Sequence, residues 1–370
     1  MGQDATDVIE RARALLDPAL RCVLDRLDPA DRRIARYHLG FADREGAPSS
    51  AGSGKLIRGV LALLSAEAVL GDEEAAAEAA LPAAVGIELV HQYSLLHDDI
   101  IDNDTERRHR PAAWTVFGQP ATILAGDALA ALAIECAFGD LDEATAGGRD
   151  GDGMTAGTSE TPPTAGAVAR ALAVATRRMV AGQAADVSFE RAAEVRLDAC
   201  LAMVADKTGA LLACAASVGA IAAGGSPEVI DGLAAFGRHV GLAFQLVDDL
   251  IGLWGTAEET GKPVGSDIES RKMSLPVVAA LQAGIAGADD SAAWHAQRLA
   301  AIYAEEAELS AVQVAGALAA IEGAGGRAWA EDEAAAQTDA ALAILHDLPI
   351  HDAVRRDLIA VTNMLCRRTG

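Results

Sequence analysis

Basic residues are in the minority in this chain of 370 residues, where 30 Lys and Arg stand against 54 Asp and Glu. The formal net charge of −24 argues against nucleic acid or an anionic membrane as the main partner. The sequence also lacks a signal peptide and any apolar run of about 18 residues, the length that spans a bilayer. We therefore expect no transmembrane segment and a cytoplasmic location.

Cysteine pairs and lysines are scarce as well. The five cysteines are scattered without a C-x-x-C pair, which favours buried thiols in a reducing compartment over disulfides. Only four residues are lysines, and every other basic residue is arginine. A lysine in such a sequence marks a place where a compact ammonium is preferred to a planar guanidinium. The alternative is a bias in base composition that leaves a few lysines at random positions. The four are Lys55, Lys207, Lys262 and Lys272.

Runs of β-branched residues are few, whereas alanine is abundant, and this composition favours helix. Apolar residues recur at helical spacing through most of the chain, and no segment has the pattern of a strand or hairpin. The range 143–166 consists mainly of Gly, Thr, Ser, Asp and Pro, so we expect a flexible surface insertion there. We predict a single all-α domain over 1–370, a large helical bundle with a central cavity. Helices are expected at about 7–27, 31–42, 56–70, 71–102, 120–141, 167–190, 195–223 and 226–253, with a loop at 255–269 and four more helices in 273–370.

An acidic cluster closes one of these apolar helices. Asp98 and Asp102 lie one turn apart on the same helical face, and we expect Asp99 to turn toward the same mouth. Carboxylates crowded in this way repel each other and lose hydration, and a cation such as Mg²⁺ relieves both costs. Arginines follow at positions 107, 108 and 110. Together the two groups indicate a polyanion such as a diphosphate, bridged by metal.

A second acidic pair, Asp248-Asp249, ends another long helix, and LVDD at 246–249 echoes LHDD at 96–99. If the two helices pack together, they form a cavity with apolar walls and carboxylates at its rim. The alternative is a pair of solvated helix ends.

The segment ELVHQYSLLHDDIID at 88–102, continuing to Arg107-Arg108, resembles the first aspartate-rich region of trans-prenyl diphosphate synthases. The resemblance covers most of the chain, and its motifs in this order are highly specific. It implies the isoprenoid synthase fold, a homodimer and Mg²⁺-dependent head-to-tail condensation of isopentenyl diphosphate with dimethylallyl, geranyl or farnesyl diphosphate. The other matching segments are GKLIR (54–58), GD (126–127), GQ (182–183), KT (207–208), FQLVDD (244–249) and GKPVGSD (261–267) through to Lys272.

The resemblance also implies roles for the residues that match these motifs. The metal ligands would be Asp98, Asp102 and Asp248, with Asp99, Asp249 and Lys207 also in the catalytic set. The allylic diphosphate would be bound by Arg107, Lys207, Thr208, Gln245 and Lys262. Isopentenyl diphosphate would be bound by Lys55, Arg58, His91 and Arg108, with Lys272 a further substrate-binding residue. All four lysines fall inside the motifs, which favours function over compositional accident.

One position departs from the family pattern. Gly252 stands where a third aspartate usually follows Asp248 and Asp249, so the carboxylate one turn after Asp248 is missing. We expect activity to survive with an altered Mg²⁺ affinity, and Gly252→Asp to be tolerated. The departure leaves room for a terpene cyclase or a non-catalytic partner subunit. The complete set of isopentenyl diphosphate residues argues against the first, and the intact acidic cluster at 98–102 argues against the second.

Product length is expected to depend on Tyr93 and Ser94, which lie five and four residues before Asp98. A single bulky ring about one turn deeper than the acidic cluster should stop the growing chain early. With no second aromatic residue at Ser94, we predict geranylgeranyl diphosphate as the product, with farnesyl diphosphate next. The alternative is that Tyr93 only packs the core.

Overall fold

The computed structural model describes residues 4–49, 52–139, 141, 162–189, 192, 194–256, 264–283, 290–305 and 307–366. These residues are helical almost throughout, which confirms the all-α prediction. The chain divides into two compact units. The first comprises Met1–Thr176, Leu211–Gly237 and Leu345–Val361, and the second comprises Arg177–Ala210, Arg238–Ile344 and Thr362–Gly370. One domain over 1–370 stays a prediction, and the insertion at 143–166 lies mostly outside the described residues.

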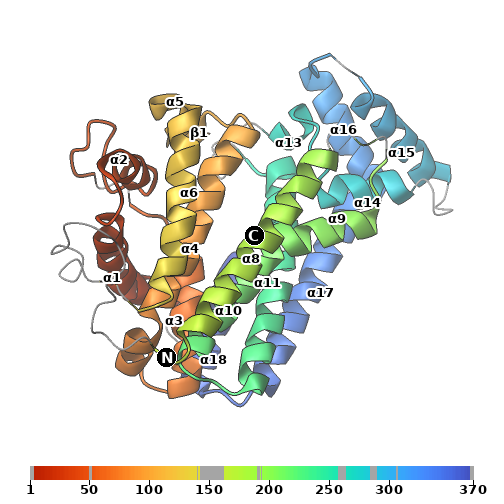
Figure 1. Ribbon diagram of the computed structural model, residues 1–370. Helices are drawn as coiled ribbons and strands as arrows, with labels where there is room; N and C mark the ends of the chain where they lie inside the picture. Colours follow the sequence, from red (N-terminus) through yellow and green to blue (C-terminus); the bar gives the residue numbers. More distant parts are fainter. Residues whose placement is uncertain are drawn as a thin grey trace. The chain divides into compact units, whose positions relative to one another are not determined.

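The first unit is organised around α4 (Glu73–Ile101), which packs against α3 (Ile57–Leu70) and α6 (Gln119–Cys136) (Figure 1). The side chain of Asp72 caps the start of α4 by accepting a hydrogen bond from the amide of Ala75 at 2.9 Å. Every residue from 83 to 90 is buried, so this part of α4 is covered on all sides. The unit also contains α1 (Ala5–Leu24), α2 (Pro29–His38), α5 (Ala113–Phe117) and most of α10 (Ala210–Ala222).

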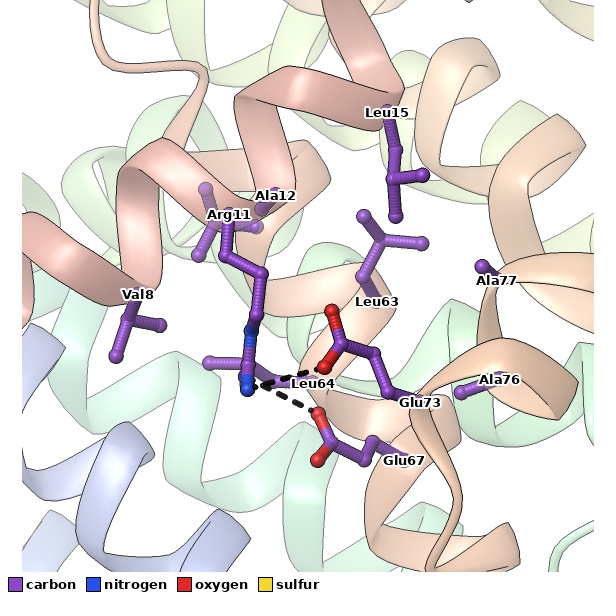
Figure 2. A pocket seen from close by; sticks show the side chains of 11 residues that line it. Val8, Arg11, Ala12, Leu15, Leu63, Leu64, Glu67, Glu73, Ala76 and Ala77 are labelled. Carbon is purple, nitrogen blue, oxygen red and sulfur yellow. Dashed lines mark hydrogen bonds and ion pairs between the residues drawn. The ribbon is translucent and has the colours of Figure 1, made fainter. Parts of the chain in front are cut away.

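An arginine of α1 joins four helices of the first unit. Arg11 forms ion pairs with Glu67 of α3 at 3.3 Å, Glu73 of α4 at 3.4 Å and Asp357 of α18 (Asp352–Cys366) at 3.1 Å. Figure 2 shows the guanidinium directed at Glu67 and Glu73 within a pocket of about 300 Å³ whose other walls are mostly aliphatic. Burial raises the pKa of Glu67 and of Asp357, and Arg11 opposes both shifts. Arg11 therefore favours the charged form of these carboxylates, which burial disfavours.

A small hairpin shows that the expectation of no strand was wrong. β1 (Glu106–Arg107) pairs antiparallel with β2 (Arg110–Pro111). The connecting residues Arg108 and His109 both have positive φ, at 52° and 58°. Two successive residues in this region make the tight turn that suits the twist of a hairpin. Neither is the Gly, Asn or Asp that usually marks such a turn, so pattern analysis did not find it.

The helices of the second unit pack on two apolar clusters, one around Leu299 and Ile321 and the other around Cys200 and Leu246. The range 273–370 contains five helices among its described residues, where four were expected. A short helix also occupies part of the loop expected at 255–269. These elements are α13 (Ser266–Glu269), α14 (Leu275–Ala283), α15 (Asp290–Tyr303), α16 (Ala311–Gly323), α17 (Gly326–Asp347) and α18.

The helix expected at 195–223 is interrupted by one π turn. It consists of α9 (Leu197–Val204), the π-helical η1 (Ala205–Gly209) and α10. The whole stretch Leu197–Ala222 has a mean hydropathy of 1.5 and the length of a membrane span, but 61% of its most apolar part is buried within the protein. The core helix of a soluble protein has the same properties. Two other long helices are α8 (Ala165–Phe189) and α11 (Pro227–Trp254).

All five cysteines are thiols, as expected. Four are buried, and Cys22 is partly exposed.

Candidate active site

The first acidic motif lies at the C-terminal end of α4. Asp98 is half-buried in the last turn, and Asp102 caps the helix with an exposed side chain. No basic residue lies in that turn, and the helix end itself carries partial negative charge. Both effects make a cation favourable beside these carboxylates.

Asp99 does not share this exposed position, which corrects the expectation that it would turn toward the same mouth. Its side chain is only 1% exposed, and Oδ1 accepts a hydrogen bond from Nε of Arg107 at 2.5 Å. Burial raises the pKa of Asp99, and the neighbouring Arg107 opposes the shift. The second carboxylate of the motif therefore holds the hairpin on α4.

The hairpin brings an arginine cluster to one pocket of the first unit. Arg107, Arg108 and Arg110 line a pocket of about 350 Å³ together with Tyr37 and His38. Burial lowers the pKa of His38 well below its usual value, and the three arginines lower it further. An imidazole that stays neutral adds no charge to three guanidiniums, so the pocket suits an anion. Sequence analysis missed Tyr37 and His38, because their only signal is spatial proximity to the hairpin.

Arg58 and His91 lie within electrostatic reach of Arg108. Burial lowers the pKa of His91 well below its ordinary value, and Arg58 and Arg108 add to the effect. Burial likewise lowers the pKa of Arg58 to about 10, although the nearby Glu88 carboxylate opposes that shift. Glu88 is fully buried and accepts a hydrogen bond from the amide of Gly59 at 2.8 Å. Its carboxylate therefore compensates the buried guanidinium.

The segment before α3 is shaped to admit Arg108. A Cβ atom on Gly54, which has φ +83°, would lie 3.3 Å from Cζ of Arg108. Lys55 follows with an exposed side chain, and Leu56 enters α3 in the left-handed region at φ 48°. Arg58, His91 and Arg108 thus come together in the first unit, with Lys55 beside them in sequence.

In the second unit, five residues that were predicted from separate motifs line one pocket of about 320 Å³. The pocket also contains Asp186, Cys200 and Ser274 among its walls. Its predicted members are Lys207, Thr208, Gln245, Asp249 and Lys272.

A chain of hydrogen bonds fixes most of these side chains. The hydroxyl of Thr208 donates to Oε1 of Gln245 at 2.8 Å, and Nε2 of Gln245 donates to Oδ1 of Asp249 at 2.8 Å. The other oxygen of Asp249 accepts from the amide of Leu275 at 2.9 Å. Burial raises the pKa of Asp249 to about 6, and Lys272 and Gln245 oppose the shift. Asp249, like Asp99, is thus a buried residue that organises its motif.

Lys207 stands on the π turn η1, and its ammonium donates to Oδ2 of Asp186 at 2.5 Å. Gly182 allows α8 to approach this turn, because a Cβ atom there would lie 2.6 Å from Cα of Lys207. Sequence analysis missed Asp186. It lies three residues after Gln183 on α8, which is the helical spacing that could have revealed it.

The remaining predicted residues have different outcomes. Asp248 is exposed on the last turns of α11, next to the buried Asp249. Ser94 donates its hydroxyl to the carbonyl of His91 at 2.8 Å, which is a local helical bond. Lys262 lies outside the described residues.

His97 and Tyr93 pack together on α4, with ring centroids 4.8 Å apart at 68°. Gly126 of α6 makes room for His97, because a Cβ atom there would lie 2.7 Å from the ring atom Cδ2. Nε2 of His97 also lies 3.1 Å from the carbonyl oxygen of Ile123. His97 therefore joins α4 to α6.

A polyprenyl synthetase family model matches residues 48–314. This range includes both acidic motifs, the pocket of the second unit and the three arginines of the first-unit pocket, but not Tyr37 and His38. The chain belongs to the polyprenyl synthetase family. It is 44% identical over 88% of its length to a (2E,6E)-farnesyl diphosphate synthase of Mycobacterium tuberculosis, of which it covers 83%. It is 38% identical over 98% of its length to a geranylgeranyl diphosphate synthase of the same species, of which it covers 93%.

A crystal structure of a polyprenyl synthetase from Streptomyces coelicolor has the same fold, with a TM-score of 0.84 and 41% identity over 98% of this chain and 99% of that one. These findings confirm the isoprenoid synthase fold and show that the protein is a prenyltransferase with trans-prenyl diphosphate synthase activity. Members of the family use divalent metal ions.

Proposed function

We propose that the protein condenses isopentenyl diphosphate with an allylic diphosphate and releases geranylgeranyl diphosphate. The observation that carries the proposal is that five predicted residues from separate motifs line one pocket of the second unit. Lys207 and Lys272 offer ammonium groups to an anion, while Thr208 and Gln245 offer oxygen dipoles suited to an allylic cation.

The arginine pocket of the first unit supports a second anion subsite, for isopentenyl diphosphate. Nε of Arg58 is buried and makes no hydrogen bond among the described residues, which fits a donor awaiting a ligand. Arg108 and His91 lie within electrostatic reach of it. His91 is neutral at pH 7 and supplies one N–H without adding charge. Lys55 is assigned to the same subsite from its motif.

The divalent ion of the reaction is Mg²⁺ in this proposal, with Asp98 and Asp102 as ligands from the first unit and Asp248 as a ligand from the second unit. Carboxylate oxygens are the hard donors this ion prefers. Among the described residues no three His, Cys, Asp or Glu side chains form a cluster that could hold a metal ion by themselves. When bound, Mg²⁺ would stabilise the negative charge that develops on the departing diphosphate. The departed diphosphate then removes the proton, and no side-chain base is needed.

Farnesyl diphosphate is the second candidate product, because the 44% identical relative carries that name. The protein is a homodimer in this proposal, as the family resemblance implies. The protein is expected to act without a membrane segment.

The test is incubation with isopentenyl diphosphate, Mg²⁺ and dimethylallyl, geranyl or farnesyl diphosphate in turn, followed by mass spectrometry. Diphosphates of 20 carbons support the proposal, and those of 15 carbons support the second candidate. Asp98→Ala should lower turnover by at least about 10²-fold, because it removes charge stabilisation at the leaving group. The exposed Asp339 on α17 provides the control Asp339→Ala. A hydrocarbon made from one allylic substrate alone would instead indicate a terpene cyclase, and no turnover a non-catalytic partner subunit.

A further inference from the structure

The position of the missing carboxylate at Gly252 is not empty. Asp248 and Gly252 lie one turn apart on α11, so a side chain at 252 would share the face of Asp248. A Cβ atom built on Gly252 would overlap Oδ2 of Asp267 and would lie 2.9 Å from its Cγ. The carboxyl group of Asp267 therefore stands where a side chain at 252 would begin.

The short helix α13 holds Asp267 in this place. Its neighbour Ile268 is fully buried in the apolar cluster around Leu299 and Ile321. The turn before it is tight, since Gly265 has φ +80° and accepts a hydrogen bond from the amide of Ile268 at 2.8 Å. The carbonyl of Asp267 then accepts from the amide of Lys272 at 2.9 Å. Asp267 thus lies between two fixed points of the backbone.

The surroundings of Asp267 have an excess of negative charge. Its Oδ2 is 3.9 Å from Nζ of Lys272. Burial disfavours the charged form of Lys272, but Asp267, Asp249, Asp248 and Asp186 more than offset this and raise its pKa. Lys207 already pairs with Asp186 at 2.5 Å, so these four carboxylates have two ammonium groups beside them. The remaining excess of negative charge leaves room for a further cation.

We propose that Asp267 supplies the carboxylate that position 252 lacks and completes the second acidic motif for the metal–diphosphate complex. The inference rests on the proposed function for the identity of that complex. The motif is therefore assembled from two elements, with Asp248 on α11 and Asp267 on α13. The glycine at 252 leaves room for this carboxyl group, because a Cβ atom there would force the Asp267 side chain to shift. Gly252→Asp should be tolerated for the same reason, because the new carboxylate takes over the place of the Asp267 carboxylate.

The experiment measures binding of inorganic pyrophosphate by calorimetry at a series of Mg²⁺ concentrations, so it needs no turnover. Asp267→Asn should raise the Mg²⁺ concentration for half-maximal pyrophosphate binding by about tenfold, with binding restored at saturating Mg²⁺. Gly252→Ala should do the same, because the methyl group displaces Asp267 without supplying an oxygen. The two changes together should cost no more than either one. Glu269→Gln, an exposed carboxylate of the same helix, is the matched control.

The rescuing variant decides the matter. Gly252→Asp combined with Asp267→Asn should restore binding. The Mg²⁺ concentration for half-maximal pyrophosphate binding should return to within about threefold of the value for the unaltered protein. Thermal unfolding without Mg²⁺ should show Gly252→Ala at least as stable as the parent, since alanine is the better helix former. The proposal is overturned if Asp267→Asn leaves the Mg²⁺ requirement unchanged, if Gly252→Ala and Asp267→Asn are additive, or if the carboxylate at 252 does not rescue. A protein that binds pyrophosphate as described but makes no prenyl diphosphate would contradict the proposed function alone.

Discussion

Arg107 of the hairpin donates from Nε to Oδ1 of Asp99 at 2.5 Å, at the end of the central helix α4. The pair links the acidic motif to the arginine pocket within the first unit. Because Arg108 follows Arg107 in the tight turn, the position of Arg108 depends on this link.

Asp99→Ala should destabilise the protein by about 2–3 kcal/mol, because it leaves the Arg107 guanidinium without its buried partner. The figure is below that of a fully buried pair because the Arg107 side chain is 27% exposed. Urea unfolding measures the loss. Glu106→Ala, an exposed change in the same hairpin, should cost less than about 0.5 kcal/mol. Equal stability of the two variants would show that the pair does not hold the hairpin.

The pairing of Asp99 also shows what sequence could and could not predict. Helical periodicity placed Asp98, Asp99 and Asp102 at the end of one helix, and it identified most helices of the fold. It could not tell which carboxylate is exposed. That depends on Arg107, whose approach is set by a hairpin without turn-forming residues.

The second unit shows the same limit. The motifs containing Lys207, Gln245 and Lys272 were found separately along the sequence, and the structure brings them to one pocket. Asp186 was missed, although it lies three residues after Gln183 on α8, because its partner Lys207 lies on another helix and only the fold brings the two together. Asp267 was found only as part of a motif. Its relation to Gly252 depends on how α13 packs against α11, which no local pattern encodes.

Arg11→Met should destabilise the protein by about 1–3 kcal/mol at pH 8, because Glu67 and Asp357 lose their shared cation while remaining partly buried. Both acids already have raised pKa values in the folded state, and losing Arg11 should raise them further. An acid whose pKa is higher in the folded state binds the proton more tightly there, so acidification favours the fold. The deficit of the variant should therefore shrink between pH 8 and pH 5.

Denaturant unfolding of both proteins at each pH measures this effect. Arg196→Met removes an exposed ion pair with Asp198 and serves as the control. Its loss of stability should be small and should not shrink between pH 8 and pH 5. A deficit for Arg11→Met that grows on acidification would contradict the role of Arg11 as the cation that favours the charged form of Glu67 and Asp357.

Cys200 and Cys214 should resist alkylation in the folded protein at pH 8. Burial raises the pKa of each thiol to about 12, so the reactive thiolate is nearly absent. Iodoacetamide labelling followed by peptide mass spectrometry should show both cysteines unmodified until urea is added. The partly exposed Cys22 should react first. Labelling of Cys214 at the rate of Cys22 without denaturant would contradict its burial.

Tyr93→Ala should lengthen the products by at least one isoprene unit. The ring of Tyr93 is half-buried and packs edge-on against His97, which is itself held against α6 by Gly126. Burial, together with Asp127 and Asp98, raises the pKa of the Tyr93 phenol, so the side chain stays neutral and suits an apolar wall. Removing the ring leaves space that the fixed His97 cannot fill, and a growing chain can extend into it.

The measurement is the product distribution from farnesyl diphosphate and excess isopentenyl diphosphate, analysed by mass spectrometry. Tyr93→Phe keeps the ring and should keep the parent distribution, whereas Tyr93→Ala should shift it to longer diphosphates. If Tyr93→Ala lowers the activity without changing the length of the products, Tyr93 only packs the core beside His97. A shift with Tyr93→Phe would instead place the control of length on the hydroxyl, because that is the only group the variant removes.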